Sequence, residues 1–185
     1  MTLQKEEYFI IEQCRKGNAE VYAVLVERYQ EMIYNVAYRM LGDADSARDI
    51  AQESFISAYG ALADFRNDSK FSTWLCSIAM NKCRDHLRVH RNMLPLDEIE
   101  EPAAARGSDP EAALSDKQSS RELQAALSAL PEDYRQVIIL KHIEGLDYRE
   151  MEALLGVSVN ALKVKTYRAR ECLKKYLGKR QQPDG

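Results

Sequence analysis

Apolar residues recur every three or four positions along almost the whole chain, and this spacing constrains the fold more than any other feature. A clear example is the set Val21, Leu25, Tyr29, Met32, Ile33, Val36, Ala37 and Met40. Such spacing places apolar side chains on one face of an α-helix. No segment shows the sustained alternation of apolar and polar residues that indicates β-strands. The sequence therefore predicts an all-α fold.

Glycine, proline and short polar side chains indicate where the helices begin and end. The first helix is expected over residues 3–15. The expected capping residues are Asn18, Asp45, Ser72 and Ser158, and the expected ends lie at Gly17, Gly42, Gly145 and Gly156. Pro131 can begin a helix because its missing amide does no harm in the first turn. Asp147 and Glu150 have the spacing of a capping box.

Residues 92–118 interrupt the helical pattern. They contain three prolines, a glycine and a cluster of acids, with too little apolar surface to fold alone. We expect a flexible acidic linker here, between a domain over residues 1–91 and a second over 119–179, with a tail over 180–185. The sequence thus predicts two small helical domains, the second containing a helix-turn-helix.

Overall composition excludes little, whereas the distribution of charge is informative. The net charge is -3, but basic residues concentrate at 82–91 and 163–180. No apolar run is long enough to cross a bilayer, and the first residues lack the hydrophobic core of a signal peptide. We expect a cytoplasmic protein with no direct membrane insertion.

Four cysteines show neither a CxxC pair nor a disulfide spacing, which indicates reduced thiols. Cys76, Cys83, His86 and His90 could share one helix face. Ligands on one straight helix rarely converge on a tetrahedral metal, so coincidence is favoured over a metal site. Neither a nucleophile with its base nor a phosphate loop is recognisable. We expect no metal, no cofactor and no catalytic residues, and hence no enzyme; the alternative is a metal-dependent nuclease that uses the Cys and His face.

The segment 65–91 combines groups that suit a partly single-stranded nucleic acid. A polar loop between Phe65 and Phe71 precedes a helix that carries an aromatic, an amide and several cations. Aromatic and amide groups recognise bases, and cations bind phosphates. The candidate residues are Arg66, Asn67, Asp68, Ser69, Lys70, Phe71, Trp74, Ile78, Asn81, Lys82, Arg84 and Arg88. The simpler alternative is a core tryptophan, a solvated asparagine and cations that favour the helix dipole.

A short helix, a turn with Gly156 and a longer basic helix form a helix-turn-helix pattern over residues 147–177. In DNA-binding examples the first turns of the second helix enter the major groove. The candidate DNA-binding residues are Ser158, Asn160, Lys163, Lys165, Tyr167, Arg168, Arg170 and Lys174. The alternative is a helical hairpin with a solvated basic face.

The third expected helix has an unusual outer face. It presents Asp49, Gln52, Glu53 and Ile56, which place an exposed isoleucine beside carboxylates and an amide. This combination is either incidental or a small protein-docking patch.

These segments together resemble the extracytoplasmic-function (ECF, group-four) sigma factors of the bacterial sigma-70 family. In the first domain the resemblance rests on RYQEMIYNVAYRMLGD, SARDIAQESFISAYGAL and FRNDSKFSTWLCSIAMNKCRDHLR, which look like parts of the family's second conserved region. In the other it rests on LSALPEDYRQVIILKHIEGLDYREMEALLGVSVNALKVKTYRARECLKKYL, which looks like the fourth. The likeness extends from about Arg15 to Leu177.

The resemblance implies a specificity subunit that binds core RNA polymerase and promoter DNA. Asp49 and Gln52 match the family's polymerase-docking DxxQ motif. Residues 66–70 with Phe71, Ile78 and Asn81 match the pocket for a base flipped from the minus-10 element. Four basic residues match positions of the helix that reads the minus-35 element: Lys163, Lys165, Arg168 and Arg170.

Two departures from the family pattern stand out, and one alternative remains. Arg48 stands where the family usually has Glu, and Lys165 stands where it commonly has Arg, which binds in a bidentate manner that Lys cannot. The family also implies control by an anti-sigma factor. The alternative function is a two-domain helix-turn-helix regulator that acts without polymerase docking.

Overall fold

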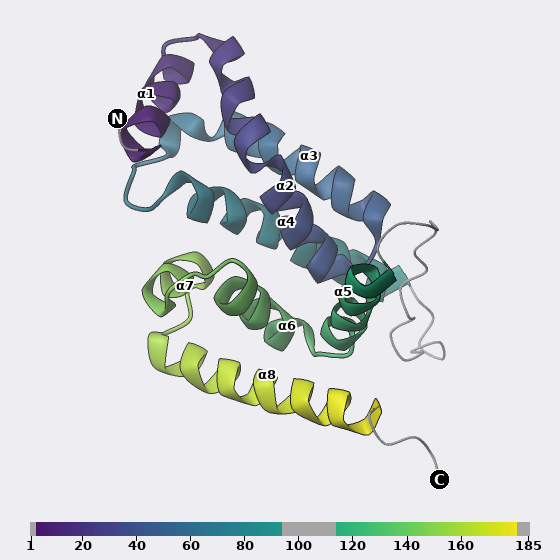
Figure 1. Cartoon of the computed structure of the whole chain (residues 1–185). Coiled ribbons are helices and arrows are strands. Elements are labelled where there is room, and N and C mark those ends of the chain that lie inside the picture. The colour runs from purple at the N-terminus through teal and green to yellow at the C-terminus, as the bar shows by residue number, and fades with distance from the viewer. Residues whose placement is uncertain (1–2, 94–113, 181–185) are drawn as a thin grey trace.

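The computed structural model describes residues 3–93 and 114–180, and within them it contains helices but no strand (Figure 1). The predicted all-α fold is therefore confirmed. The N-terminal half comprises α1 (Leu3–Arg15), α2 (Tyr22–Leu41), α3 (Ala44–Gly60) and α4 (Phe71–Met93). The C-terminal half comprises α5 (Leu114–Ser128), α6 (Glu132–Ile138), α7 (Tyr148–Leu155) and α8 (Val159–Arg180). Three shorter helical turns join them: η1 (Ala19–Val21), η2 (Leu62–Asp64) and the π-helix η3 (Ile139–Ile143).

The predicted linker lies largely outside the described residues. Helix α4 continues to Met93 and α5 begins at Leu114, so both helices reach into the range 92–118.

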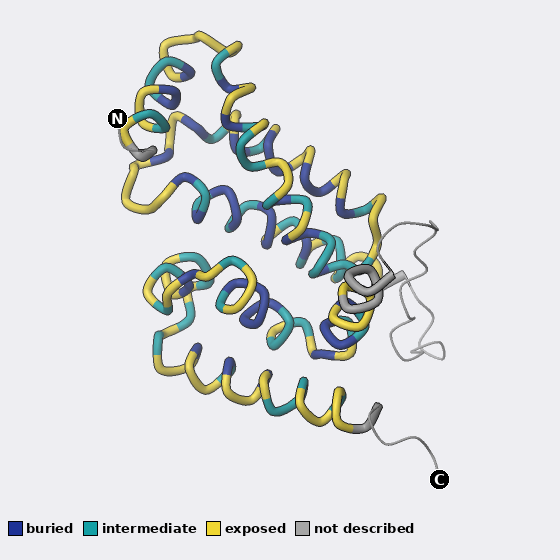
Figure 2. Tube along the Cα trace, in the orientation of Figure 1, coloured by how far each residue is buried: buried dark blue, intermediate teal, exposed yellow. Residues whose placement is uncertain are grey.

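In the N-terminal half, α2, α3 and α4 pack together and α1 lies across the end of α2 (Figure 1). Their buried core contains Leu25, Ile33, Phe55, Phe71 and Leu75 among others. Leu25, Ile33, Phe55 and Leu75 occupy the apolar stripes that the sequence spacing predicted, which is why each helix shows a buried and an exposed side (Figure 2). Phe71 was expected among the DNA-binding residues, but it is only 2% exposed and belongs to this core.

In the C-terminal half, α6 and α8 make the main helix contact, and α7 packs against both α8 and η3. Gly156 ends α7 in the left-handed region at φ 65°, and α8 begins three residues later. This short helix, tight turn and long helix form the predicted helix-turn-helix. Leu162 and Ala169 of α8 are fully buried, so its opposite side is free for other contacts (Figure 2).

The capping predictions are partly wrong. Asp43, not Asp45, caps α3, because its carboxylate accepts a hydrogen bond of 2.8 Å from the Ser46 amide. Helix α4 begins at Phe71, so Ser72 lies inside the first turn, and Asn18 makes no side-chain capping bond. The capping box of Asp147 and Glu150 is present as predicted.

The two halves share one apolar core. Val36, Met40, Cys76, Met80 and Cys83 of α2 and α4 form a single buried cluster with C-terminal residues, which include Leu127, Leu130, Val137, Ile138, Leu140 and Met151. Helix α4 thus lies between two cores, with Phe71, Leu75 and Ala79 facing one and Cys76, Met80 and Cys83 facing the other.

Candidate nucleic-acid and protein interfaces

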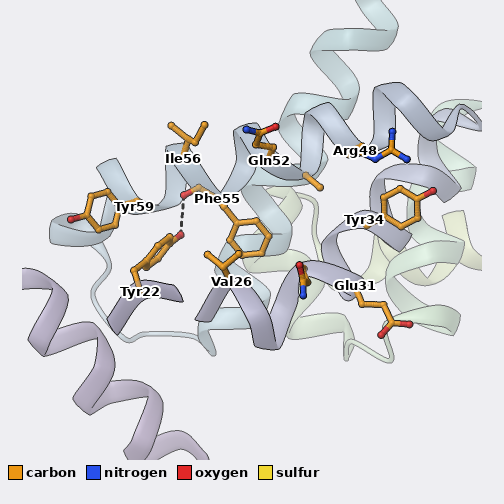
Figure 3. Close-up of a pocket in the computed structure, with 11 residues that line it drawn as sticks. Tyr22, Val26, Glu31, Tyr34, Arg48, Gln52, Phe55, Ile56 and Tyr59 are labelled. Carbon is orange, nitrogen blue, oxygen red and sulfur yellow. Dashed lines mark hydrogen bonds between the residues drawn. The ribbon is translucent and has the colours of Figure 1, made fainter. Parts of the chain in front are cut away.

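An open groove of ≈ 740 Å³ runs between α2 and α3 (Figure 3). Of the predicted docking residues, Gln52 and Ile56 line it, and the Ile56 side chain is 64% exposed. Asp49 and Glu53 are exposed but do not line the groove, and Glu53 lies 3.3 Å from the Lys82 ammonium. The structure therefore brings together two of the four predicted residues.

The opposite wall of the groove comes from α2, which the sequence analysis did not select. Its lining residues on this helix are Tyr22, Val26, Gln30, Glu31 and Tyr34. The Tyr22 hydroxyl donates a 2.9 Å hydrogen bond to the Phe55 carbonyl, and burial raises the pKa of Tyr22, so this phenol stays neutral. The available signal was the four-residue spacing of Tyr22, Val26, Gln30 and Tyr34, which lie beside the apolar stripe that the sequence analysis selected.

The chemistry of the groove suits another protein better than a nucleic acid. Its floor and walls are mostly apolar and aromatic, with the Gln52 amide and the Arg48 guanidinium at one end (Figure 3). Arg48, which occupies the position where sigma factors usually have Glu, pairs with Asp45 at 2.9 Å. An apolar centre with a polar rim is the usual composition of a protein interface.

The polar loop before α4 is anchored by aromatic rings. Phe65, Phe71 and Trp74 lie with ring centroids 4.9 to 5.8 Å apart, so Trp74 is partly a core residue, as the simpler reading held. Asn67 has a positive φ of 60°, a backbone conformation that Asn adopts more readily than most other residues. Arg66, Asn67, Asp68, Ser69 and Lys70 are all exposed.

A pocket of ≈ 360 Å³ lies between this loop and α1. Asn67, Ser69, Lys70 and Phe71 line it from the loop side, and the α1 side includes Lys5 and Tyr8, neither of which the sequence analysis selected. Tyr8 is 53% exposed. The sequence alone could not show this exposure, because it depends on how α1 packs against the loop.

The remaining predicted residues of α4 form a separate surface. Asn81, Arg84 and Arg88 line a shallow pocket of ≈ 580 Å³ together with Asp85 and Glu132. Ile78 is instead partly buried against the N-terminal core, and Lys82 is paired with Glu53. The structure therefore does not bring Ile78 and Asn81 into the loop pocket; it presents two neighbouring surfaces along the start and the end of α4.

The basic face of α8 is presented as predicted. The exposed members are Ser158, Asn160, Lys163, Tyr167, Arg168, Arg170 and Lys174. Tyr167 is 67% exposed, which leaves its ring available for contact. Lys165 differs, because its ammonium lies 2.6 Å from the Asp133 carboxylate and is only one-third exposed. Lys174 pairs with Glu171 on the same helix.

The Cys and His face of α4 does not form a ligand cluster. Cys76 and Cys83 are buried in the shared core, and burial raises the pKa of both thiols, that of Cys83 to about 12. A thiol with such a raised pKa is neither a good nucleophile nor a metal ligand. Within residues 3–93 and 114–180, no three His, Cys, Asp or Glu side chains come together in a way that could hold a metal ion.

These features define a helical protein with candidate DNA-binding surfaces on both halves and an apolar groove between α2 and α3. No helix in the described part of the chain combines the length and apolarity needed to cross a bilayer. The comparisons with known families are more specific. Residues 25–93 match the family model of sigma-70 region 2, and residues 120–173 match that of sigma-70 region 4.

Similar proteins agree with both matches over nearly the whole chain. ECF RNA polymerase sigma factor SigW of Bacillus subtilis is 37% identical, over 90% of this chain and 94% of that protein. RNA polymerase sigma-H factor of Pseudomonas aeruginosa is 34% identical over 96% of both chains. The chain therefore belongs to the ECF sigma factors of the sigma-70 family, and its function is that of an RNA polymerase sigma factor.

Solved structures show the same fold. CnrH, in complex with the cytosolic domain of CnrY, is 26% identical and aligns with a TM-score of 0.70 over 92% of this chain and 96% of its own. The sigma factor RpoE of Bartonella quintana, in complex with the anti-sigma factor NepR, is 22% identical and aligns with a TM-score of 0.71 over 85% and 96%.

Proposed function

We propose that this sigma factor divides its tasks between its halves. Residues 1–91 form the region 2 domain, which docks core RNA polymerase and melts the minus-10 element. Residues 119–179 form the region 4 domain, whose α8 reads the minus-35 element. Residues 92–118 connect the two domains, and residues 180–185 follow the second. The match of both sigma-70 regions, in order, to the halves that carry the candidate surfaces supports this division.

For docking, we assign the α2–α3 groove as the main contact with the polymerase. Gln52 and Ile56 supply an amide and an exposed apolar side chain at its rim. Asp49 and Glu53, on the same exposed side of α3, add a negative edge that can orient the partner through charge.

For melting, we propose that the loop pocket binds one base of the unpaired strand and that the end of α4 binds the sugar-phosphate backbone of this strand. Unstacking a base costs a few kcal/mol, which stacking on aromatic rings and hydrogen bonds to its edges can offset. Asn67, Ser69 and Tyr8 supply such groups in a pocket large enough for one base. Arg84 and Arg88, beside Asn81, supply the cations for phosphates.

For the minus-35 element, we assign the exposed side of α8. Asn160 and Lys163 lie in its first turns, where base edges are read, while Arg168, Arg170 and Lys174 lie further along, where phosphates are held. Lys165 contributes less because it is paired with Asp133.

We also propose control by an anti-sigma factor and a cytoplasmic location. RpoE of Bartonella quintana was solved with an anti-sigma factor, and CnrH with the cytosolic domain of another protein. The protein acts by positioning the polymerase and carries no catalytic group of its own; in this proposal no metal or cofactor takes part.

The decisive experiment is transcription in vitro with core RNA polymerase and a library of genomic fragments. We expect initiation at a small set of start sites that share minus-10 and minus-35 elements, only when the chain is added. Fragment binding without any initiation would instead identify a regulator that acts without the polymerase. A chain that neither binds core enzyme nor directs initiation would refute the proposal.

A further inference from the structure

Helix α8 carries an exposed valine on the side that points most directly away from the C-terminal core. Leu162, Thr166 and Ala169 face this core and are at most 3% exposed. Val164 lies two positions after Leu162 and two before Thr166, and two positions correspond to about 200° around a helix. The Val164 side chain therefore lies opposite the buried side, and it is 50% exposed. The sequence analysis did not select this residue.

Two candidate DNA-binding residues lie on the same line of α8. Asn160 precedes Val164 by four positions and Tyr167 follows it by three, so the three exposed side chains share one face. Cations lie on both sides of this line. Lys163 is about 100° from Val164 around the helix in one direction, and Arg168 is about 40° from it in the other. An amide, an aliphatic and an aromatic side chain thus form a line that is flanked by positive charge.

This arrangement restricts what the centre of the line can recognise. A helix that lies in the major groove contacts base edges, while cations hold the phosphates. Every base pair presents hydrogen-bonding groups in this groove, but only thymine presents a methyl group. Val164 can neither donate nor accept a hydrogen bond from its side chain, so it would leave the polar edges of other bases unpaired. Contact with a thymine methyl group buries apolar surface on both partners, which is favourable.

We propose that Val164 reads the 5-methyl group of a thymine in the minus-35 element. The inference rests on the proposed assignment of α8 to that element, and it names the base feature that α8 recognises. The Asn160 amide can bond to the N6 and N7 atoms of adenine, and it lies about 6 Å from Val164 along the helix axis. At roughly 3.4 Å a base pair, this distance corresponds to one or two base pairs. We therefore expect the thymine to lie in an A·T-rich part of the element.

The simpler alternative is a valine that contacts only solvent. Single apolar side chains are common on protein surfaces. Val24 of α2 is such a residue: it is 42% exposed and lines none of the three pockets described above. Because the two valines have similar exposure and differ in position, Val24 is the matched control for Val164.

The methyl group can be removed from the DNA as well as from the protein. Deoxyuridine differs from thymidine only by lacking the 5-methyl group. We would take a promoter fragment from the transcription experiment and replace each thymine of its minus-35 element, on both strands, one at a time. Binding to each fragment is then measured for holoenzyme made with the native chain, Val164→Ser, Val164→Ile or Val24→Ser.

For the native chain we expect one thymine whose replacement weakens binding roughly fourfold, the effect of one buried methyl group. Val164→Ser should bind the unmodified fragment weaker by at least this factor, and uracil at the same position should cost it nothing further, because both changes remove one contact. Val164→Ile keeps an apolar side chain and should keep the dependence on the methyl group, as should Val24→Ser. Val164→Ser should also leave the salt dependence of binding unchanged, because valine neutralises no phosphate.

Three results would overturn the inference: no thymine of the element responds to loss of its methyl group, Val164→Ser responds as strongly as the native chain, or Val164→Ser changes the salt dependence. A failure of the proposed function is distinguishable from these results. Holoenzyme that does not initiate, or whose binding ignores the minus-35 sequence, would refute the assignment of α8 and the inference with it. Binding that depends on this sequence but not on any methyl group would refute the inference alone.

Discussion

Gln52 holds its amide at the rim of the α2–α3 groove, next to the exposed Ile56 side chain. We predict that Gln52→Ala weakens binding to core RNA polymerase by about 1 kcal/mol, or roughly fivefold in Kd, because one interfacial hydrogen bond is lost. Competition against a labelled sigma factor for core enzyme measures this change. Glu27→Ala, on an exposed position of α2 outside the groove lining, is the matched control and should bind as the native chain. Equal losses in both variants would place the docking surface elsewhere.

Asp43 is the residue where the sequence analysis chose the wrong cap. Asp43 and Asp45 both precede the apolar stripe of α3, and periodicity alone cannot decide between them. Only the backbone decides: Asp43 is extended and accepts from the Ser46 amide, while Asp45 lies in the first turn and pairs with Arg48. The hydrogen bond from Ser46 lowers the pKa of the Asp43 carboxyl.

We predict that Asp43→Ala lowers the free energy of unfolding at neutral pH by about 1 kcal/mol, the usual worth of a helix cap. Because the folded state lowers the pKa of Asp43, this contribution is complete above the unfolded pKa of about 3.9 and is lost as the pH falls through the lower folded value. Urea denaturation at neutral and acid pH measures both effects. Asp45→Ala should cost only a few tenths of a kcal/mol, as for an exposed helix pair; a larger loss there than at Asp43 would contradict the observed cap.

At the scale of elements, the sequence predicted the type of each helix well and its ends less well. Helix α1 ends just before Gly17, and α7 and α8 begin directly after Asp147 and Ser158, as predicted, because those signals are local. The π-helix at 139–143 was not predicted; its Ile139 and Leu140 are buried in the shared core. The α2 wall of the groove was missed because only the stripe from Val21 to Met40 was selected, whereas Tyr22 and Tyr34 lie on the side of α2 that lines the groove.

The basic side of α8 allows a prediction about DNA binding. Arg168 is exposed and lies among the residues assigned to phosphates, whereas Lys165 is held by Asp133 at 2.6 Å. We predict that Arg168→Ala weakens minus-35 binding and reduces the slope of log K against log salt concentration by about 1, because one phosphate contact releases one set of counterions. Asp133→Asn should act in the opposite direction, since it frees Lys165. Binding of holoenzyme to a promoter fragment across a salt series tests both; unchanged slopes in both variants would exclude α8 as a phosphate-binding element.

At the scale of the whole molecule, the sequence did not predict that the halves share a core. The signal was present, because Cys76, Met80, Cys83 and Leu87 form a second apolar stripe on α4 beside that of Leu75 and Ala79. Two of its members are cysteines and two histidines lie nearby, so the stripe was considered as a set of soft ligands. The acidic linker suggested two independent domains. The composition of a linker, however, does not show whether the surfaces of the two domains are complementary.

Glu144 makes the packing between the two halves depend on pH. Glu144 lies in the C-terminal half, and burial raises the pKa of its carboxyl, while the charge of Arg39 in the N-terminal half opposes this rise. The charge of Glu144 also acts on the Cys76 thiol in the shared core. A raised pKa means that the packed halves bind more protons than separated halves, so ionised Glu144 weakens the packing at neutral pH and protonation strengthens it as the pH falls through the raised value.

We predict that Glu144→Gln slows the reaction of N-ethylmaleimide with Cys76 and Cys83 of the shared core relative to the native chain at pH 7, as followed by peptide mass spectrometry. Cys14, in the N-terminal core, should react as in the native chain, and the difference should shrink as the pH is lowered towards the pKa of Glu144. Faster labelling in Glu144→Gln at pH 7 would mean that attraction to Arg39 outweighs the burial of the carboxyl.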